Sequence, residues 1–130
     1  MKTILIVEDE RNLNEAYQFI LKKHGYEVKT AYNGVEALEF VSKQDPDLIL
    51  LDLRMPIMDG LEFLRKYDKS KEHPDVKVVV FSNLDSKEDI AEAYELGADK
   101  YMLKAWSSPK ELAALVEDIF SEASTNADKS

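Results

Sequence analysis

The sequence predicts an α/β fold built on a five-stranded parallel sheet. Strand-like and helix-like segments alternate five times along the 130 residues, a length that suits one domain. Most of the strand-like segments contain continuous apolar runs, and turn or capping residues separate them from the helical segments. Alternation of this kind favours parallel strands joined by right-handed crossovers.

The five predicted strands are short. They are Thr3–Val7, Glu27–Ala31, Asp47–Leu51, Lys77–Phe81 and Lys100–Leu103. Four of them contain runs of aliphatic or aromatic residues without polar alternation, namely Ile4–Val7, Leu48–Leu51, Val78–Phe81 and Tyr101–Leu103. Such runs are typical of strands that helices cover on both faces of a sheet.

The segments between the strands have the apolar spacing of amphipathic helices. The first and last segments show it most clearly, at Leu13, Ala16, Tyr17, Ile20 and Leu21, and at Leu112, Leu115, Val116, Ile119 and Phe120. Four helix starts carry a capping pair in which an acid follows the cap by three residues: Asn33 with Glu36, Asp59 with Glu62, Ser86 with Asp89, and Ser108 with Glu111. Gly25 and Gly97 fit left-handed stops after the first and fourth helices.

The last ten residues, Ser121 to Ser130, are small and polar. They predict a frayed end or the start of a linker. We therefore expect a domain over residues 1–123 and a polar tail over residues 124–130.

Composition and charge exclude several classes of protein. The chain has no cysteine, so disulfides and cysteine-ligated metals are impossible. Apolar runs fall short of the roughly 20 residues that span a bilayer, and the first run is too short for a signal peptide. Lysine and arginine number 17 against 26 acids, a net charge of −9 that would repel a nucleic-acid backbone. We expect a cytoplasmic protein that binds neither membranes nor nucleic acid directly.

Polar side chains stand where the predicted strands end. Glu8 and Asp9 follow the first strand, Asp52 the third, Ser82 the fourth and Lys104 the fifth. Each alone is common as a helix start, turn residue or surface lysine. The carboxyl ends of parallel strands, however, open onto one edge of a sheet, so these groups should share one pocket.

The residue types in this pocket favour phosphoryl chemistry. Three adjacent carboxylates repel one another unless a proton or a cation intervenes, and an all-oxygen site of this kind suits Mg²⁺. Lys104 and Ser82 can each meet an oxygen of a phosphoryl group. Asp52, central in the pocket, can act as a nucleophile and form an acyl phosphate.

At these residues the chain resembles the receiver domain of bacterial two-component response regulators. The matching segments are Val7–Glu10, Leu51–Gly60, Phe81–Asn83 and Gly97–Lys104. The resemblance implies a doubly wound, flavodoxin-like sheet of order 2-1-3-4-5 with helices on both faces. It also implies a signalling switch rather than an enzyme, one that assists only its own phosphorylation and dephosphorylation.

The resemblance implies a role for each matching residue. Asp52 would accept a phosphoryl group from a sensor histidine kinase or a phosphotransfer protein. Mg²⁺ would be held by Asp9, Asp52 and the backbone carbonyl of Arg54, with Glu8 acting directly or through water. Ser82 and Lys104 would bind the phosphoryl group, and Ser82 and Tyr101 would move together in the switch. Arg54 and Asn83 are candidates for setting the lifetime of the acyl phosphate.

The family's usual output surface would consist of the fourth helix, the fifth strand and the fifth helix. A downstream protein would bind there, and the chain would be a monomer or a phosphorylation-dependent dimer. Trp106 fits either this surface or simple packing on the last helix. Ala105 departs from the proline that usually follows the lysine, which leaves the shape of that loop open.

Two other functions remain as alternatives. A degenerate receiver would act as a protein-binding scaffold without phosphorylation. A phosphatase of the haloacid dehalogenase type also uses an aspartate nucleophile with Mg²⁺, but it typically has a second aspartate two residues later. Arg54 occupies that position, so the expected general acid/base is missing. A flavin-binding module is disfavoured because Glu8, Asp9 and Glu10 would repel the flavin phosphate.

Overall fold

The computed structural model describes residues 1–68, 72–83, 86–104 and 108–129, the last eight by their backbone alone. Within these residues, ten elements follow one another. They are β1 (Thr3–Val7), α1 (Arg11–Lys23), β2 (Glu27–Ala31), α2 (Gly34–Lys43), β3 (Leu48–Leu51), α3 (Gly60–Tyr67), β4 (Lys77–Ser82), α5 (Lys87–Glu95), β5 (Lys100–Leu103) and α6 (Pro109–Lys129). In these labels, the fourth and fifth helices of the predicted output surface are α5 and α6.

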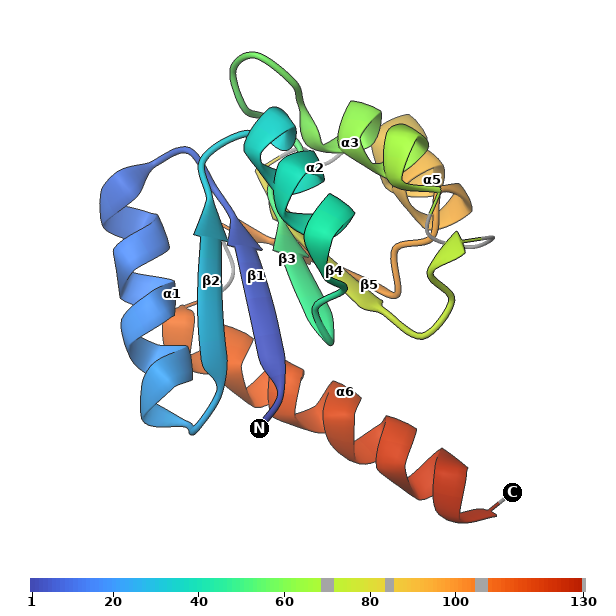
Figure 1. Cartoon of the computed structure of the whole chain (residues 1–130). Helices are drawn as coiled ribbons and strands as arrows, with labels where there is room; N and C mark the ends of the chain where they lie inside the picture. Colours follow the sequence, from blue (N-terminus) through green and yellow to red (C-terminus); the bar gives the residue numbers. More distant parts are fainter. Residues whose placement is uncertain (69–71, 84–85, 105–107, 130) are drawn as a thin grey trace.

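The five strands form one parallel sheet in the order β2-β1-β3-β4-β5 (Figure 1). This confirms the doubly wound fold. The order reverses direction beside β1, so β1 and β3 are neighbours although α1, β2 and α2 separate them in sequence. The side chains of residues that follow β1 and β3 are thereby brought together at the carboxyl edge of the sheet.

Two apolar cores lie on opposite faces of the sheet. In β1, Ile4 and Ile6 pack with Tyr17 of α1 and Val116 of α6. The alternate residues of the same strand face a second core, formed with α2, α3 and α5. Because successive side chains of a strand point to opposite faces, a fully apolar strand serves both cores at once.

The predicted strand limits differ from the structure at two ends. β3 begins at Leu48 rather than Asp47, and at this end of the strand the Asp47 carboxylate accepts a hydrogen bond from the backbone N–H of Thr3 at 2.7 Å. β4 extends one residue further than predicted, to Ser82, which pairs in register with Leu103 of β5. Ser82 is therefore the last residue of a strand rather than the first of a loop.

All four predicted helix caps are present. The cap side chain accepts the backbone N–H three residues later at 2.9 Å for Asn33 and Asp59, 3.1 Å for Ser86 and 3.2 Å for Ser108. Gly25 and Gly97 have φ angles of 92° and 111°, the left-handed backbone expected after a helix.

The frayed end predicted from Ser121 is wrong, because α6 continues as a helix to Lys129. The segment after Ser121 contains neither glycine nor proline, so no residue in it stops a helix. The division of the chain at residue 123 stays a prediction. Within the described ranges, no helix has the combination of length and apolar character that crossing a bilayer requires.

Tyr67 lies in a polar contact that the sequence did not reveal. The buried Tyr67 hydroxyl donates to the Asp45 carboxylate at 3.0 Å, and its ring stacks on His73 with 4.1 Å between centroids. Burial, and then the bond to Asp45, raise the pKa of the Tyr67 hydroxyl. The folded chain therefore resists an ionisation that the unfolded chain undergoes near its ordinary pKa of about 10.

This contact predicts a loss of stability in alkali. The contribution of Tyr67 is complete below the unfolded pKa and is lost as pH rises above it, because only the unfolded state then releases the proton. The urea midpoint should fall between about pH 9 and about pH 11, and less steeply for Tyr67→Phe. Equal slopes for wild type and Tyr67→Phe would contradict this account. The control is Tyr94→Phe, at an exposed position, which should show the wild-type slope.

Candidate functional site

Three carboxylates meet at the carboxyl edge of the sheet. Glu8 and Asp9 follow β1, and Asp52 follows the neighbouring β3. One oxygen of each lies within 4.8 Å of the others. Glu8 and Asp52 are buried, with 1% and 4% of their surface exposed, whereas Asp9 is exposed. The cluster therefore opens to solvent on the Asp9 side.

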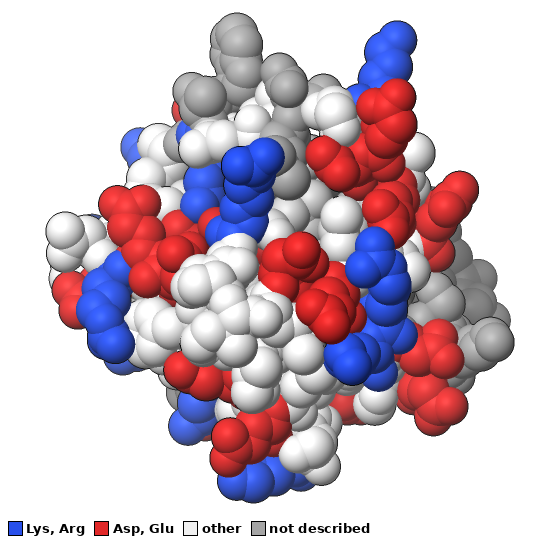
Figure 2. All heavy atoms as spheres, turned by 90° about the horizontal axis from the view of Figure 1, so that it is seen from above, with Lys and Arg blue, Asp and Glu red and all other residues white. Residues whose placement is uncertain are grey.

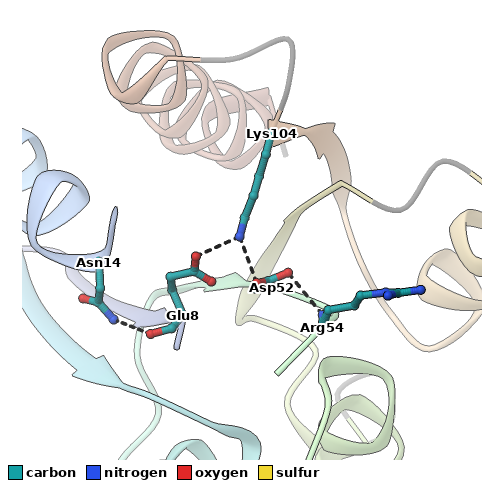
Figure 3. Close-up of polar contacts among 5 residues, drawn as sticks. All are labelled: Glu8, Asn14, Asp52, Arg54 and Lys104. Carbon is teal, nitrogen blue, oxygen red and sulfur yellow. Dashed lines mark hydrogen bonds and ion pairs between the residues drawn. The ribbon is translucent and has the colours of Figure 1, made fainter. Parts of the chain in front are cut away.

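Lys104 bridges the two buried acids from the end of β5. Its Nζ donates to Glu8 Oε1 at 2.8 Å and to Asp52 Oδ2 at 2.9 Å (Figure 3). The lysine side chain is 15% exposed. It joins residues that are 96 and 52 positions away in sequence. The predicted convergence of the acids with Lys104 is thus present in the structure.

The charges of this cluster are unequal. Burial, followed by the contact with Asp52, raises the pKa of Glu8 to about 8, although Lys104 opposes the shift. Burial by itself would lower the pKa of Lys104, but its hydrogen bonds to Glu8 and Asp52 raise it overall, so the ammonium stays charged. The cluster holds three carboxyl groups against one ammonium, so a proton or a further cation is needed to balance it.

One buried oxygen of the cluster is left for a proton or a further cation. Oε2 of Glu8 is buried, and no residue in the described part of the chain donates to it. A buried carboxylate oxygen without a donor is costly unless a proton or a metal ion meets it. With Asp9 and Asp52 close by, the donor set is entirely oxygen, which suits Mg²⁺.

The loop between β3 and α3 holds Asp52 in place. The backbone N–H of Arg54 donates to Asp52 Oδ1 at 3.2 Å, while the Arg54 side chain extends away from that carboxylate (Figure 3). Beside the cluster lies a cavity of about 500 Å³. Its lining residues are Asp9, Leu53, Arg54, Met55, Pro56, Asp59, Leu61 and Asp89. Acidic groups with interspersed Lys and Arg surround this edge of the sheet (Figure 2).

Two glycines pack closely against the loop between β3 and α3. The N–H of Gly60 donates to Leu53 O, and the N–H of Gly34 donates to Met58 O, each at 3.0 Å. A Cβ at Gly60 would lie 2.4 Å from the backbone oxygen of Asp52, and one at Gly34 would lie 2.7 Å from Met58 O. The path of the loop therefore depends on the absence of a side chain at both positions.

The other predicted site residues lie at or near the same edge. Ser82 is buried at the end of β4, between the strands that carry Asp52 and Lys104. Tyr101 is half-buried on β5 opposite Val80, and Asn83 is exposed just after β4. Their roles stay predictions. Ala105 and Trp106 lie outside the described residues.

The sequence analysis missed Asn14. This residue of α1 is completely buried, and its Nδ2 donates to the backbone carbonyl of Glu8 at 2.9 Å (Figure 3). The sequence feature that could have revealed Asn14 is its helical spacing from Tyr17 and Leu21, which places a polar residue on the buried face of the helix.

Comparison with known proteins identifies the family. The family model described as response regulator receiver domain matches residues 4–117. The chain belongs to the response regulator receiver domain family. It is thus a receiver domain of two-component signalling, in agreement with the resemblance seen at the strand ends.

Three solved receiver structures illustrate the similarity. A CheY-like receiver domain protein from Methanospirillum hungatei JF-1 is 29% identical, with a TM-score of 0.88, and the match covers 97% of this chain and 98% of that chain. The signal receiver domain of a signal transduction histidine kinase from Syntrophus aciditrophicus is 33% identical, with a TM-score of 0.82 and coverages of 94% and 92%. The Mn²⁺-bound form of response regulator Rcp1 is 31% identical, with a TM-score of 0.76 and coverages of 93% and 93%.

Proposed function

We propose that this receiver domain accepts a phosphoryl group on Asp52 in a Mg²⁺-dependent reaction. The donor would be the phosphohistidine of a sensor kinase or a phosphotransfer protein. The observation that carries the proposal is the position of the Asp52 carboxylate, which lies in the acid cluster while Lys104 donates to its Oδ2. An acceptor, a cation site and a phosphoryl-binding amine are thereby adjacent.

The donor set of the cluster supports a divalent cation. Glu8, Asp9, Asp52 and the backbone carbonyl of Arg54 would hold Mg²⁺, and the unpaired Glu8 Oε2 is one oxygen that the ion would meet. The similarity to a receiver solved in its Mn²⁺-bound form agrees with this assignment. When bound, the ion would neutralise negative charge on the phosphoryl oxygens.

The protein's own groups account for the transfer. A carboxylate oxygen of Asp52 attacks phosphorus, the P–N bond of the donor breaks, and its electron pair leaves with the imidazole. The N–H of Arg54 keeps the Asp52 carboxylate oriented. Lys104 exchanges its contact with Asp52 Oδ2 for one with a phosphoryl oxygen, and Ser82 donates to another.

The same contacts would drive the switch. A phosphoryl group that binds Ser82 and Lys104 favours the conformation in which both can reach it. Tyr101 lies on β5, and Lys104 follows the same strand. We propose that a movement of Tyr101 transmits this change to the surface formed by α5, β5 and α6, where a downstream protein would bind. Arg54, which lines the cavity beside the cluster, and the exposed Asn83 would set how readily water reaches the acyl phosphate.

The proposal is tested by intact mass after incubation with Mg²⁺ and a small phosphodonor. Wild type should gain the mass of one phosphoryl group, and Asp52→Asn should gain none. Asp118→Asn, at an exposed position on α6, is the matched control and should behave as wild type. Equal modification of Asp52→Asn would refute the acceptor, and an unmodified wild type would favour the scaffold alternative.

A further inference from the structure

A chain of two side-chain amides leads from α1 to the backbone of Glu8, one of the three acids of the cluster. Gln18 Nε2 donates to Asn14 Oδ1 at 2.9 Å, and Asn14 Nδ2 donates to the carbonyl of Glu8 at 2.9 Å. Asn14 is completely buried, whereas Gln18 is partly exposed one helical turn later. Both polar ends of the Asn14 amide are thus engaged, with the donor end directed at the site.

The Glu8 backbone is held on both sides by these contacts. Its N–H donates to Ala31 O of β2 at 3.0 Å, and its carbonyl accepts from Asn14. One peptide joins Glu8 to Asp9, and both residues contribute a carboxyl group to the cluster. Fixing its plane therefore fixes the directions in which both acids leave the backbone.

The start of α1 lacks a side-chain cap, which makes the hydrogen bond from Asn14 to Glu8 more important. The N-cap residue Glu10 makes no side-chain capping bond, and the first turn has no acid. The other helices whose caps are described begin with a side-chain oxygen that accepts an amide. At α1, the Asn14 amide instead joins the first turns of the helix to the end of β1.

We infer that Asn14 is a positioning residue for the cation-binding carboxylates and that Gln18 sets the orientation of its amide. The inference rests on the proposed function, because it assumes that Glu8 and Asp9 bind the ion. Groups behind metal ligands hold those ligands in the geometry that the metal needs. Their loss typically weakens metal binding about 10- to 100-fold.

A purely structural role predicts something different. Deleting a satisfied buried amide destabilises any protein, so a fall in stability would not separate the two readings. Positioning predicts that Mg²⁺ affinity changes out of proportion to stability. The decisive readout is therefore the Mg²⁺ dissociation constant of the folded chain, measured by titration calorimetry beside a urea unfolding curve.

The first variant is Asn14→Leu, which keeps the approximate size and removes the donor to Glu8. Its Mg²⁺ dissociation constant should rise about tenfold. The matched control is Leu21→Ala on the same helix, completely buried among core residues. This control should lower the urea midpoint strongly and leave the dissociation constant within about twofold of wild type, as separate sites behave independently.

The second variant, Gln18→Glu, separates the effect of amide orientation from the effect of added charge. Gln18 is partly exposed, so this substitution is expected to cost little stability. The introduced carboxylate only accepts hydrogen bonds, so it draws Nδ2 of Asn14 away from Glu8. Orientation through Asn14 therefore predicts weaker Mg²⁺ binding, by about threefold or more. The added negative charge alone would make binding slightly tighter.

The outcomes distinguish this inference from the proposed function. Weaker binding in both Asn14→Leu and Gln18→Glu, with Leu21→Ala unchanged, supports the positioning role. Wild-type affinity in Asn14→Leu, or tighter binding in Gln18→Glu, overturns it while the proposed function stands. Should wild type itself bind no Mg²⁺, the proposed cation site and the positioning role both fall.

Discussion

Replacing Lys104 by methionine is expected to destabilise the domain by about 3 kcal/mol, because removing one partner from a buried charge pair leaves the other uncompensated. Here two carboxylates, Glu8 and Asp52, lose the ammonium that donates to both. The raised pKa of Glu8 allows it to take up a proton, which keeps the cost near the lower end of the usual range. Urea unfolding without Mg²⁺ measures the effect.

The same variant should also impair the chemistry. Loss of one group that stabilises developing charge typically slows a reaction by about 100- to 1000-fold, and phosphorylation of Lys104→Met by a small donor should fall in this range. Lys100→Met is the matched control, since Lys100 is exposed at the start of β5, the strand that Lys104 follows. A stable Lys104→Met that phosphorylates at the wild-type rate would mean that the observed ion pairs have no role.

Substituting Gly60 by alanine is the second change with a large expected effect. The added methyl would lie 2.4 Å from Asp52 O and 2.9 Å from Leu53 Cα, and both are backbone atoms that cannot turn aside. Overpacking of this kind costs about 1–3 kcal/mol. Because the displaced backbone carries Asp52, the rate of phosphorylation should fall with the stability.

Gly25→Ala provides the control for a glycine substitution. Gly25 has a φ of 92°, but among the described residues no heavy atom lies within 4 Å of the added Cβ. Its cost of about 1 kcal/mol therefore comes from backbone strain remote from the site. Phosphorylation should then proceed as in wild type. If Gly60→Ala matched Gly25→Ala in both stability and phosphorylation rate, the close approach to Asp52 would be irrelevant.

Features set by local chemistry could be predicted from the sequence. The caps at Asn33, Asp59, Ser86 and Ser108 depend on residues three positions apart, and all four are present. The convergence of Glu8, Asp9, Asp52 and Lys104 follows from parallel strands ending at one edge, so it needed only the strand assignments. Strand ends were less accurate because Asp47 and Ser82 are placed by contacts with other strands.

Features set by packing between distant segments could not be predicted. The contact of Asn14 with Glu8 and the approach of Gly60 to Asp52 depend on how helices and loops lie against the strands. The stack of Tyr67 on His73 likewise joins α3 to the segment before β4. The continuation of α6 after Ser121 was not predicted, because the small polar residues there were taken as a frayed end or the start of a linker, although none of them stops a helix.

The central claim is that Asp52 is the residue that becomes phosphorylated. The most direct test is chemical localisation: the domain is treated with Mg²⁺ and a small phosphodonor, reduced with borohydride, digested and sequenced by mass spectrometry. Reduction converts an aspartyl phosphate to homoserine, so the account predicts homoserine at position 52 and unmodified aspartate at position 9. Homoserine at Asp9, at Asp59 or elsewhere, with Asp52 intact, would contradict it.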